Sequence, residues 1–350
     1  MSENRSEIEP RPPMTAAPYA REAHVALPLV LLGAVLVALV SLPFWGGGSL
    51  QRTALEFFYF LALAQAWNLM AGYAGMMSIG QQAFVGIGAY SLVVFAEDLG
   101  LNPFLTIPLA AVVAMILALP SSWLLFRLKG AYFAVATWVI AETVRLAVNA
   151  NIDWLGGGRG RTVRSLGQFD RHLREDLGYY AGLALALIAV FGVFFLLRSK
   201  TGLALQAIRD TENGARAVGV ETRRTKRIVY LFAAAIAGAT GALIYIVQIN
   251  VRPDAAFSIN WAAYVIFIVV IGGIGTIEGP ILGTILFFVL RDLLEGLEAW
   301  SMLIFGLIAI VMMLFAPKGI WGVMNAHRPV PLFRTARKLP ARFHSEGTKT

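Results

Sequence analysis

Long runs of apolar residues, separated by short polar segments, dominate this chain of 350 residues. A helix needs about 20 predominantly apolar residues to cross a membrane, and several of the runs reach that length. We therefore predict an all-α, polytopic membrane protein with about ten spans. The predicted spans are Val25–Trp45, Thr53–Ala71, Gly72–Ala96, Pro103–Phe126, Ala131–Ala150, Tyr179–Leu197, Ile228–Ile249, Trp261–Thr276, Pro280–Leu290 and Met302–Ala316.

Composition supports the same class. Hydrophobic residues make up 58% of the chain and charged residues only 14%, whereas roughly a quarter of a soluble domain is charged. The net charge of +8 is divided among loops and tails, a pattern typical of anchoring at an anionic membrane surface rather than of nucleic-acid binding.

Basic residues orient the predicted spans. The loop 198–227 carries the densest cluster of Lys and Arg near any apolar run, so the positive-inside rule places it in the cytoplasm. Ten spans in the permease domain 25–316 put the N-terminal tail 1–24, which we expect to be disordered, and the basic C-terminal tail 317–350 on that same side. The loop 151–177 then lies outside despite its five arginines, which four acidic residues partly offset.

A short helix is predicted in the middle of loop 198–227, at about 210–219. Asp210 or Thr211 can cap its N-terminus, and Gly219 can end it. Glu212 falls in its first turn, where the helix dipole favours an anion. The small residues of this helix are Gly214, Ala215 and Ala217. They would let another protein pack closely, and we favour such a docking surface over a solvated amphipathic linker.

The glycine-rich stretch Gly72–Tyr90 is the candidate for lining a solute path. We predict that its helix is broken or closely packed, and its candidate path residues are Gly75, Ser78, Gln81 and Gln82. A broken helix exposes backbone dipoles at mid-membrane depth, where a zwitterion can bind without a buried side-chain charge. Packing is the alternative, since glycine lets helices approach and Ser or Gln then bond across the interface. Packing is favoured for the glycines, whereas the two glutamines leave both interpretations open.

Two acidic residues also occur in or beside predicted spans. Glu142 lies about 18 Å along its helix from Gly130, at ~1.5 Å per residue, and is a fifth candidate for the path because intramembrane ions are commonly functional. Arg145 lies three residues further on, so a mutually neutralising structural pair is equally consistent. Glu278 lies at a helix break, and we favour a position at the cytoplasmic interface over one facing a cavity.

Sequence motifs exclude several kinds of chemistry. The chain has no cysteine, which rules out disulfides and thiolate chemistry, and its four histidines lie outside the apolar runs. It contains neither the phosphate-loop pattern nor the hydrolase patterns G-x-S-x-G and H-E-x-x-H. We predict no catalytic residue, cofactor or metal site, and transport is the remaining function for so many spans.

Four motifs then occur in an order typical of one family. They are GYAGMMSIGQQAFVGIGAY, RLKGAYFAVATWVIAETVRL, SKTGLALQAIRDTENGARAVGV, and VVIGGIGTIEGPILGT followed by LFAPKGI. From about residue 53 to 322 the chain resembles the Liv-type permease subunits of ABC importers for branched-chain amino acids, on the M-type side. The resemblance implies that Glu212, Ala215, Arg216 and Gly219 belong to the E-A-A…G loop, whose short helix docks on a separate ATPase subunit.

The same resemblance implies partners and a location. The partners are a second, homologous H-type permease, two ATPase subunits and a periplasmic or extracellular solute-binding protein, and the location is a bacterial cell (inner) membrane with both termini cytoplasmic. ATP-driven closure of the ATPases would push on the helix at 210–219 and rock the membrane helices.

Three positions depart from the family pattern. Leu155–Gly160 lacks the Thr, Ser and Asp of T-G-G-S-[DN]-G, Glu278 replaces a bulky residue, and Gln81 replaces the His of S-[IL]-G-H. The solute could therefore be another amino acid, an amide or an aromatic carboxylate. The alternatives from other classes are a self-contained secondary transporter or channel, for which Glu142 is the one candidate ion ligand, and a membrane scaffold subunit.

Overall fold

The computed structural model describes residues 26–296 and 298–327, and the predicted tail 1–24 and residues 328–350 of the predicted tail 317–350 lie outside them. The chain divides into two compact units, residues 1–41 and 42–350. The described part of the first unit is helical and belongs to α1 (Ala26–Trp45). All other elements belong to the second unit.

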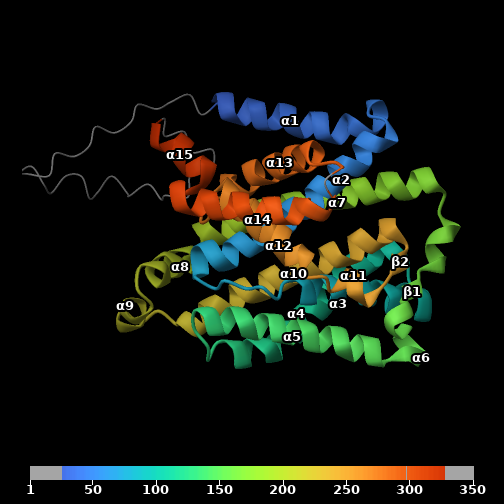
Figure 1. Ribbon diagram of the computed structural model, residues 1–350, viewed down its shortest axis with the longest axis horizontal. Helices are drawn as coiled ribbons and strands as arrows, with labels where there is room; N and C mark the ends of the chain where they lie inside the picture. Colours follow the sequence, from blue (N-terminus) through green and yellow to red (C-terminus); the bar gives the residue numbers. More distant parts are fainter. Residues whose placement is uncertain (1–25, 297, 328–350) are drawn as a thin grey trace, which may run out of the picture. The chain divides into compact units, whose positions relative to one another are not determined.

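The second unit is built from helices that run side by side (Figure 1). Its α-helices are α2 (Gly48–Asn68), α3 (Gln82–Val93), α4 (Thr106–Leu125), α5 (Ala131–Ala150), α6 (Ile152–Leu155), α7 (Arg171–Arg198), α8 (Lys200–Asp210), α9 (Glu212–Ala217), α10 (Thr222–Gln248), α11 (Pro253–Ala256), α12 (Asn260–Gly272), α13 (Glu278–Leu293), α14 (Glu298–Phe315) and α15 (Gly319–His327). Its π- and 3-10 segments are η1 (Leu69–Tyr73), η2 (Val94–Asp98), η3 (Pro103–Leu105), η4 (Gly157–Arg159) and η5 (Arg164–Gln168). Two short strands, β1 (Arg161–Thr162) and β2 (Asn250–Val251), pair antiparallel.

Length and composition make this a multi-pass membrane protein. Among the described residues, seven helical segments are long and apolar enough to cross a membrane, whereas the sequence predicts about ten spans. They are Gly48–Tyr73, Pro103–Leu125, Ala131–Ala150, Arg171–Arg198, Thr222–Gln248, Pro253–Gly272 and Trp300–Asn325. The last of them runs past Pro317, so α15 extends structure into the segment predicted as a tail.

Helices α2 and α10 form the centre of the second unit, whereas α4, α5 and α14 keep most of their apolar surface uncovered. Glycine permits this packing. A Cβ added at Gly241 of α10 would overlap the carbonyl of Val85 in α3, and one at Gly88 would overlap the carbonyl of Gly238. Small residues thus allow backbone-to-backbone contact. In lipid there is no hydrophobic driving force between helices, so close packing of this kind holds them together.

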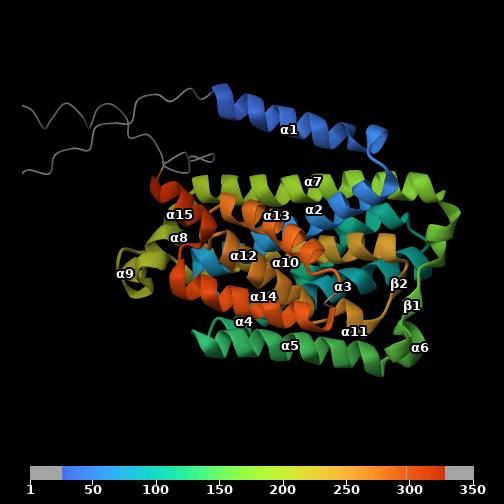
Figure 2. The same ribbon diagram turned by 45° about the horizontal axis from the view of Figure 1, so that its top comes forward.

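Figure 2 shows two distinct ends of this unit. Helices α8 and α9 gather at one end, here called the α9 end. Strands β1 and β2 and helix α6 lie at the opposite end, here called the β end. Loop 151–170 therefore lies at the β end and loop 198–227 at the α9 end, which is consistent with the opposite sides predicted for them.

At the β end, an ion pair ties the loop to the helical body. Arg161 donates to Oδ1 of Asp98 at 2.8 Å, and the indole of Trp154 donates to Oδ2 at 2.9 Å. The Arg161 hydrogen bond is the main reason why the pKa of Asp98 is lowered, although burial opposes it. Asp98, which is distant in the sequence, thus neutralises part of the positive charge of loop 151–177. The sequence pattern did not reveal this pairing.

This pair predicts a pH dependence of the loop. A carboxyl whose pKa falls on folding adds stability above its unfolded pKa of about 3.9, and that stability is lost as the pH drops through the lower, folded value. We expect the amide of Val163, which donates to Ile249, to exchange faster in Asp98→Asn than in the wild type at pH 6. The difference should vanish in strong acid. Equal exchange at pH 6, after correction for intrinsic rates, would show that the pair does not hold the loop.

Candidate functional site

The first candidate region is α9 and its flanks at the α9 end. Thr211 is the N-cap of α9, although its side chain makes no capping hydrogen bond, and Gly219 follows the C-cap Val218 with a left-handed φ of +85°. The helix therefore begins and ends where cap chemistry predicts. An ordinary side chain disfavours that φ, so glycine at 219 sets the direction in which the chain leaves α9.

Glu212 anchors α9 to the next helix. Its carboxylate accepts from Arg216 at 2.5 Å and from Lys226 of α10 at 2.9 Å. Partial burial would raise the pKa of Glu212, but the hydrogen bond from Lys226 and the charges of Lys226, Arg216 and Lys129 outweigh it and lower the pKa. The carboxylate is thus charged at neutral pH and holds a basic group on each side.

The remaining predicted coupling residues face in different directions. Ala215 is buried against the chain's own helices, at 2% exposure, so it does not lie on the outer surface of α9. Arg216 also donates to the Thr222 hydroxyl at 3.1 Å. The exposed side of α9 ends at Val218, whose side chain is 77% exposed. A partner docking here would therefore meet the side of α9 opposite Ala215.

The second candidate region is the broken helix between η1 and α3. Residues 75–80 are not helical, and Gly75 has a φ of +66°. The segment runs back along α2 in the opposite direction: the Trp67 indole donates to the carbonyl of Ser78 at 2.7 Å, and the Gln81 amide donates to the carbonyl of Leu63 at 3.2 Å. The stretch Gly72–Tyr90 is therefore both broken, at residues 75–80, and closely packed, as at Gly88.

Polar groups in this region are buried and incompletely paired. Ser78, Gln81 and Gln82 are each 2% exposed or less. The Ser78 hydroxyl accepts from the backbone N–H of Gly80 at 3.2 Å. The Oε1 atoms of Gln81 and Gln82 have no hydrogen-bond partner among the described residues. A buried acceptor without a partner is costly, so each such atom calls for an explanation.

Glu142 belongs to an ion cluster on α5. Its carboxylate accepts two hydrogen bonds from Arg145 Nε at 3.0 Å, and Arg145 also donates to Asp254 of α11 at 2.6 Å. The predicted i,i+3 pair therefore forms and gains a third member. All three side chains are partly or largely exposed, from 24% for Arg145 to 62% for Asp254.

Glu278 is buried at the start of α13, at 8% exposure. It lines a cavity of about 250 Å³ with Tyr73, Arg209 and Trp321 at the α9 end. The sequence favoured an interfacial position, whereas the side chain faces this cavity.

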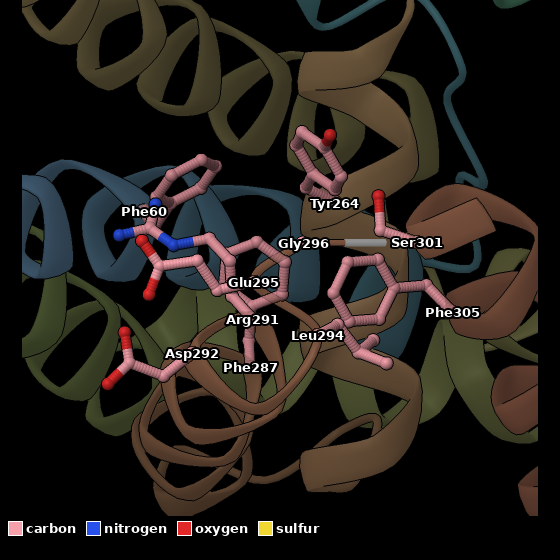
Figure 3. A pocket seen from close by; sticks show the side chains of 10 residues that line it. All are labelled: Phe60, Tyr264, Phe287, Arg291, Asp292, Leu294, Glu295, Gly296, Ser301 and Phe305. Carbon is pink, nitrogen blue, oxygen red and sulfur yellow. The ribbon is translucent and has the colours of Figure 1, made fainter. Parts of the chain in front are cut away.

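A second cavity, of about 330 Å³, lies between α2, α12, α13 and α14. Figure 3 shows the charged ends of Arg291, Asp292 and Glu295 at one side of it, away from Tyr264 and Phe305. Its aromatic rings contact one another at centroid distances such as 5.3 Å for Tyr264 and Phe287, and Arg291 is paired with Glu56 at 2.7 Å. These contacts show that the residues lining the cavity pack the helices together. We therefore assign the cavity no role.

Gln65, Trp67 and Asn68, near the end of α2, are buried polar or amphipathic residues that the sequence analysis did not select. Each donates a side-chain hydrogen bond to the backbone of a non-helical segment. The sequence could have pointed to them, because the side-chain amides of Gln65 and Asn68 lie inside the apolar run Thr53–Ala71. Polar groups within a span are costly unless they find a partner.

Comparisons with known proteins place the chain among permeases. The family described as "Branched-chain amino acid transport system / permease component" matches residues 49–317. The high-affinity branched-chain amino acid transport system permease protein LivM of Escherichia coli is 30% identical over 317 residues, which cover 83% of this chain and 74% of that protein.

Two further relatives broaden the group. The fructose import permease protein FruG of Bifidobacterium longum is 30% identical over 149 residues, 40% of this chain and 43% of that protein. A probable branched-chain amino acid transport permease protein LivH of Methanocaldococcus jannaschii is 22% identical over 280 residues, 70% of this chain and 83% of that protein. No solved structure matches the chain significantly.

These relatives are permeases rather than enzymes, which confirms that the chain is a transport subunit and that it resembles the M-type proteins. The four ordered motifs therefore reflect common descent, and the chain belongs to the family of branched-chain amino acid transport system permease components.

Proposed function

We propose that this chain is the membrane-spanning subunit of an ATP-driven importer, and that α9 is the helix through which separate ATPase subunits move it. The observation that carries the proposal is the attachment of α9. Glu212 fixes this six-residue helix to α10 through Lys226, so a push on α9 passes into a long apolar helix at the centre of the unit. Glu212, Ala215, Arg216 and Gly219 are the proposed coupling residues.

The proposed topology has ten spans with both termini in the cytoplasm of a bacterial cell. Seven spans correspond to the long apolar helical segments. The other three would be α1, the stretch 74–96, in which residues 75–80 are not helical, and α13. The basic loop 198–227 is then cytoplasmic, which agrees with the positive-inside rule. Loop 151–177, held by the Asp98–Arg161 pair, is external.

The proposed solute is a branched-chain amino acid or a related small polar solute, on the analogy of LivM. We place Gly75, Ser78, Gln81 and Gln82 on its path. The unpartnered Oε1 atoms of Gln81 and Gln82 support this placement, because buried acceptors can bind the N–H groups of a passing ammonium or amide. FruG, which is similar to part of this chain, is named for a sugar, so we infer that the path residues rather than the fold set the solute.

Glu142 would lie beside the path, in the cluster on α5. Three partly exposed charges within a span are unfavourable against lipid, and they normally face water or protein. This side of α5 therefore suits contact with a water-filled path or with the second, H-type permease. A LivH relative is consistent with such a pair of related chains. Two ATPases and an external binding protein complete the proposed assembly.

A direct test of the energy source distinguishes an ATP-driven importer from a secondary transporter. A secondary transporter needs an ion-coupling carboxylate, whereas Glu142 is already neutralised by Arg145. In liposomes that contain the full assembly, we expect labelled leucine uptake to require internal ATP and to continue after an ionophore has collapsed ion gradients. An ATPase variant that cannot hydrolyse ATP is the control. Uptake without ATP, driven by a proton or sodium gradient, would reject the proposed function.

A further inference from the structure

Two breaks in the helices meet at one place on α2. The first break is the segment 74–81, and the second is the turn 273–277 between α12 and α13. Three side chains near the end of α2 hydrogen-bond to the backbone of these breaks: Gln65, Trp67 and Asn68. All three are buried, at 3% exposure or less.

The turn 273–277 is held most tightly. Asn68 donates to the carbonyl of Thr276 at 2.7 Å and accepts from the N–H of Gly275 at 2.8 Å. Gln65 donates to the carbonyl of Ile277 at 2.7 Å. Three successive residues of the turn are thus bonded to α2, from positions 207 to 212 residues away in the chain.

The segment 74–81 is bonded to the same stretch of α2. Trp67 donates to the carbonyl of Ser78 at 2.7 Å, and Gln81 donates back to the carbonyl of Leu63 at 3.2 Å. Because the α2 side chains that hold the two breaks are buried, breaking one of these bonds would leave a polar group without a partner. We therefore expect both breaks to move together with the end of α2 rather than independently.

The turn also meets the coupling region. A Cβ at Gly275 would lie 3.2 Å from a guanidinium nitrogen of Arg209, near the end of α8. Gln206 and Arg209 of α8 and Thr276 of the turn line the same cavity of about 250 Å³. Helix α8 is joined to α9 through the single residue Thr211, so a displacement of α9 reaches the turn through α8.

We propose that Gln65, Trp67 and Asn68 are positioning residues that carry this displacement from the turn 273–277 to the segment 74–81, and so reshape the solute path when the ATPases move α9. The inference rests on the proposed function. It adds which side chains link the ATPase subunits to the solute path. These side chains must act through hydrogen bonds to the backbone rather than by contacting the solute.

The chain offers a matched pair for the test. Gln51 lies on the same helix, is also buried, and donates from Nε2 to Asp176 at 2.8 Å, near the opposite end of α2. Methionine has nearly the shape of glutamine but cannot donate such a bond. Gln65→Met and Gln51→Met therefore each remove one hydrogen bond donated by a buried glutamine amide, to a backbone carbonyl at one end of α2 and to a carboxylate at the other. Only the first bond lies between the breaks.

The measurement is the number of leucine molecules transported per ATP hydrolysed, in liposomes with the complete assembly. We expect Gln65→Met to lower this ratio at least about fivefold, the lower limit typical of coupled sites, while ATP hydrolysis continues. Gln51→Met should leave the ratio unchanged. A ratio that is unchanged in Gln65→Met, or lowered equally in both variants, would overturn the inference. A merely structural role would reduce the amount of assembled protein without altering the ratio.

A second measurement covers variants that assemble poorly. Because the chain has no cysteine, Met77→Cys introduces a single thiol at a side chain that is 59% exposed in the segment 74–81. Its labelling rate by a maleimide should change with ATP in the otherwise wild-type assembly, and this change should be lost when Asn68→Leu is added. If the change persists in the double variant, the inference fails. If the wild-type assembly takes up leucine without ATP, the proposed function fails instead.

Discussion

Glu212→Ala is expected to reduce solute uptake and solute-stimulated ATP hydrolysis at least about tenfold, which corresponds to roughly 1.4 kcal/mol. The substitution removes the acceptor shared by Arg216 and Lys226. Lys226 is only 18% exposed, and leaving a buried polar group without its partner costs about 1–3 kcal/mol. Helix α9 then loses its ion pair with α10 and keeps the hydrogen bond from Arg216 to the Thr222 hydroxyl. Uptake and ATP hydrolysis by the reconstituted assembly are the measurements, with insertion checked separately.

Loop 198–227 supplies a matched control. Glu221 also forms an ion pair, with Arg224 at 3.7 Å, but both side chains are more than 70% exposed. Exposed pairs contribute about 0–1 kcal/mol, so Glu221→Ala should leave both activities near the wild-type level. If Glu212→Ala retained full activity, or if both variants lost activity equally, α9 could not be the coupling helix.

Gly241→Val is expected to produce the largest loss of stability. The new Cβ would overlap the carbonyl of Val85, so α3 and α10 would have to separate along a backbone contact at the centre of the unit. Overpacking of this kind costs about 1–3 kcal/mol and occasionally more. We expect most of the variant to aggregate on extraction into detergent, and the remainder to melt several degrees below the wild type, as measured by size-exclusion chromatography after heating.

The control is the same substitution at Gly306 of α14, where a Cβ would meet nothing within 4 Å. Both changes place valine inside a helix, so their intrinsic helix propensities cancel. Gly306→Val should therefore elute and melt like the wild type. Equal stability of the Gly241 and Gly306 variants would show that the α3–α10 contact relaxes without cost.

The sequence by itself determined features that depend on local chemistry. Apolar length predicts the spans, because each helix satisfies its own backbone in lipid. Cap residues predict the bounds of α9, since Thr211 and Gly219 flank it, although the Thr211 side chain makes no capping hydrogen bond. The i,i+3 spacing predicts the pairing of Glu142 with Arg145. The four ordered motifs indicate the family.

Only the tertiary structure decided which distant groups meet. Asp254 joins Arg145 from 109 residues away, and Asn68 bonds to Gly275 across 207 residues. It also turned Ala215 inward and Glu278 toward a cavity. The physical reason is that a polar side chain in an apolar run must find a hydrogen-bond partner. Any free backbone group of a broken helix can be that partner. The packing of the helices, rather than spacing along the chain, selects which one it is.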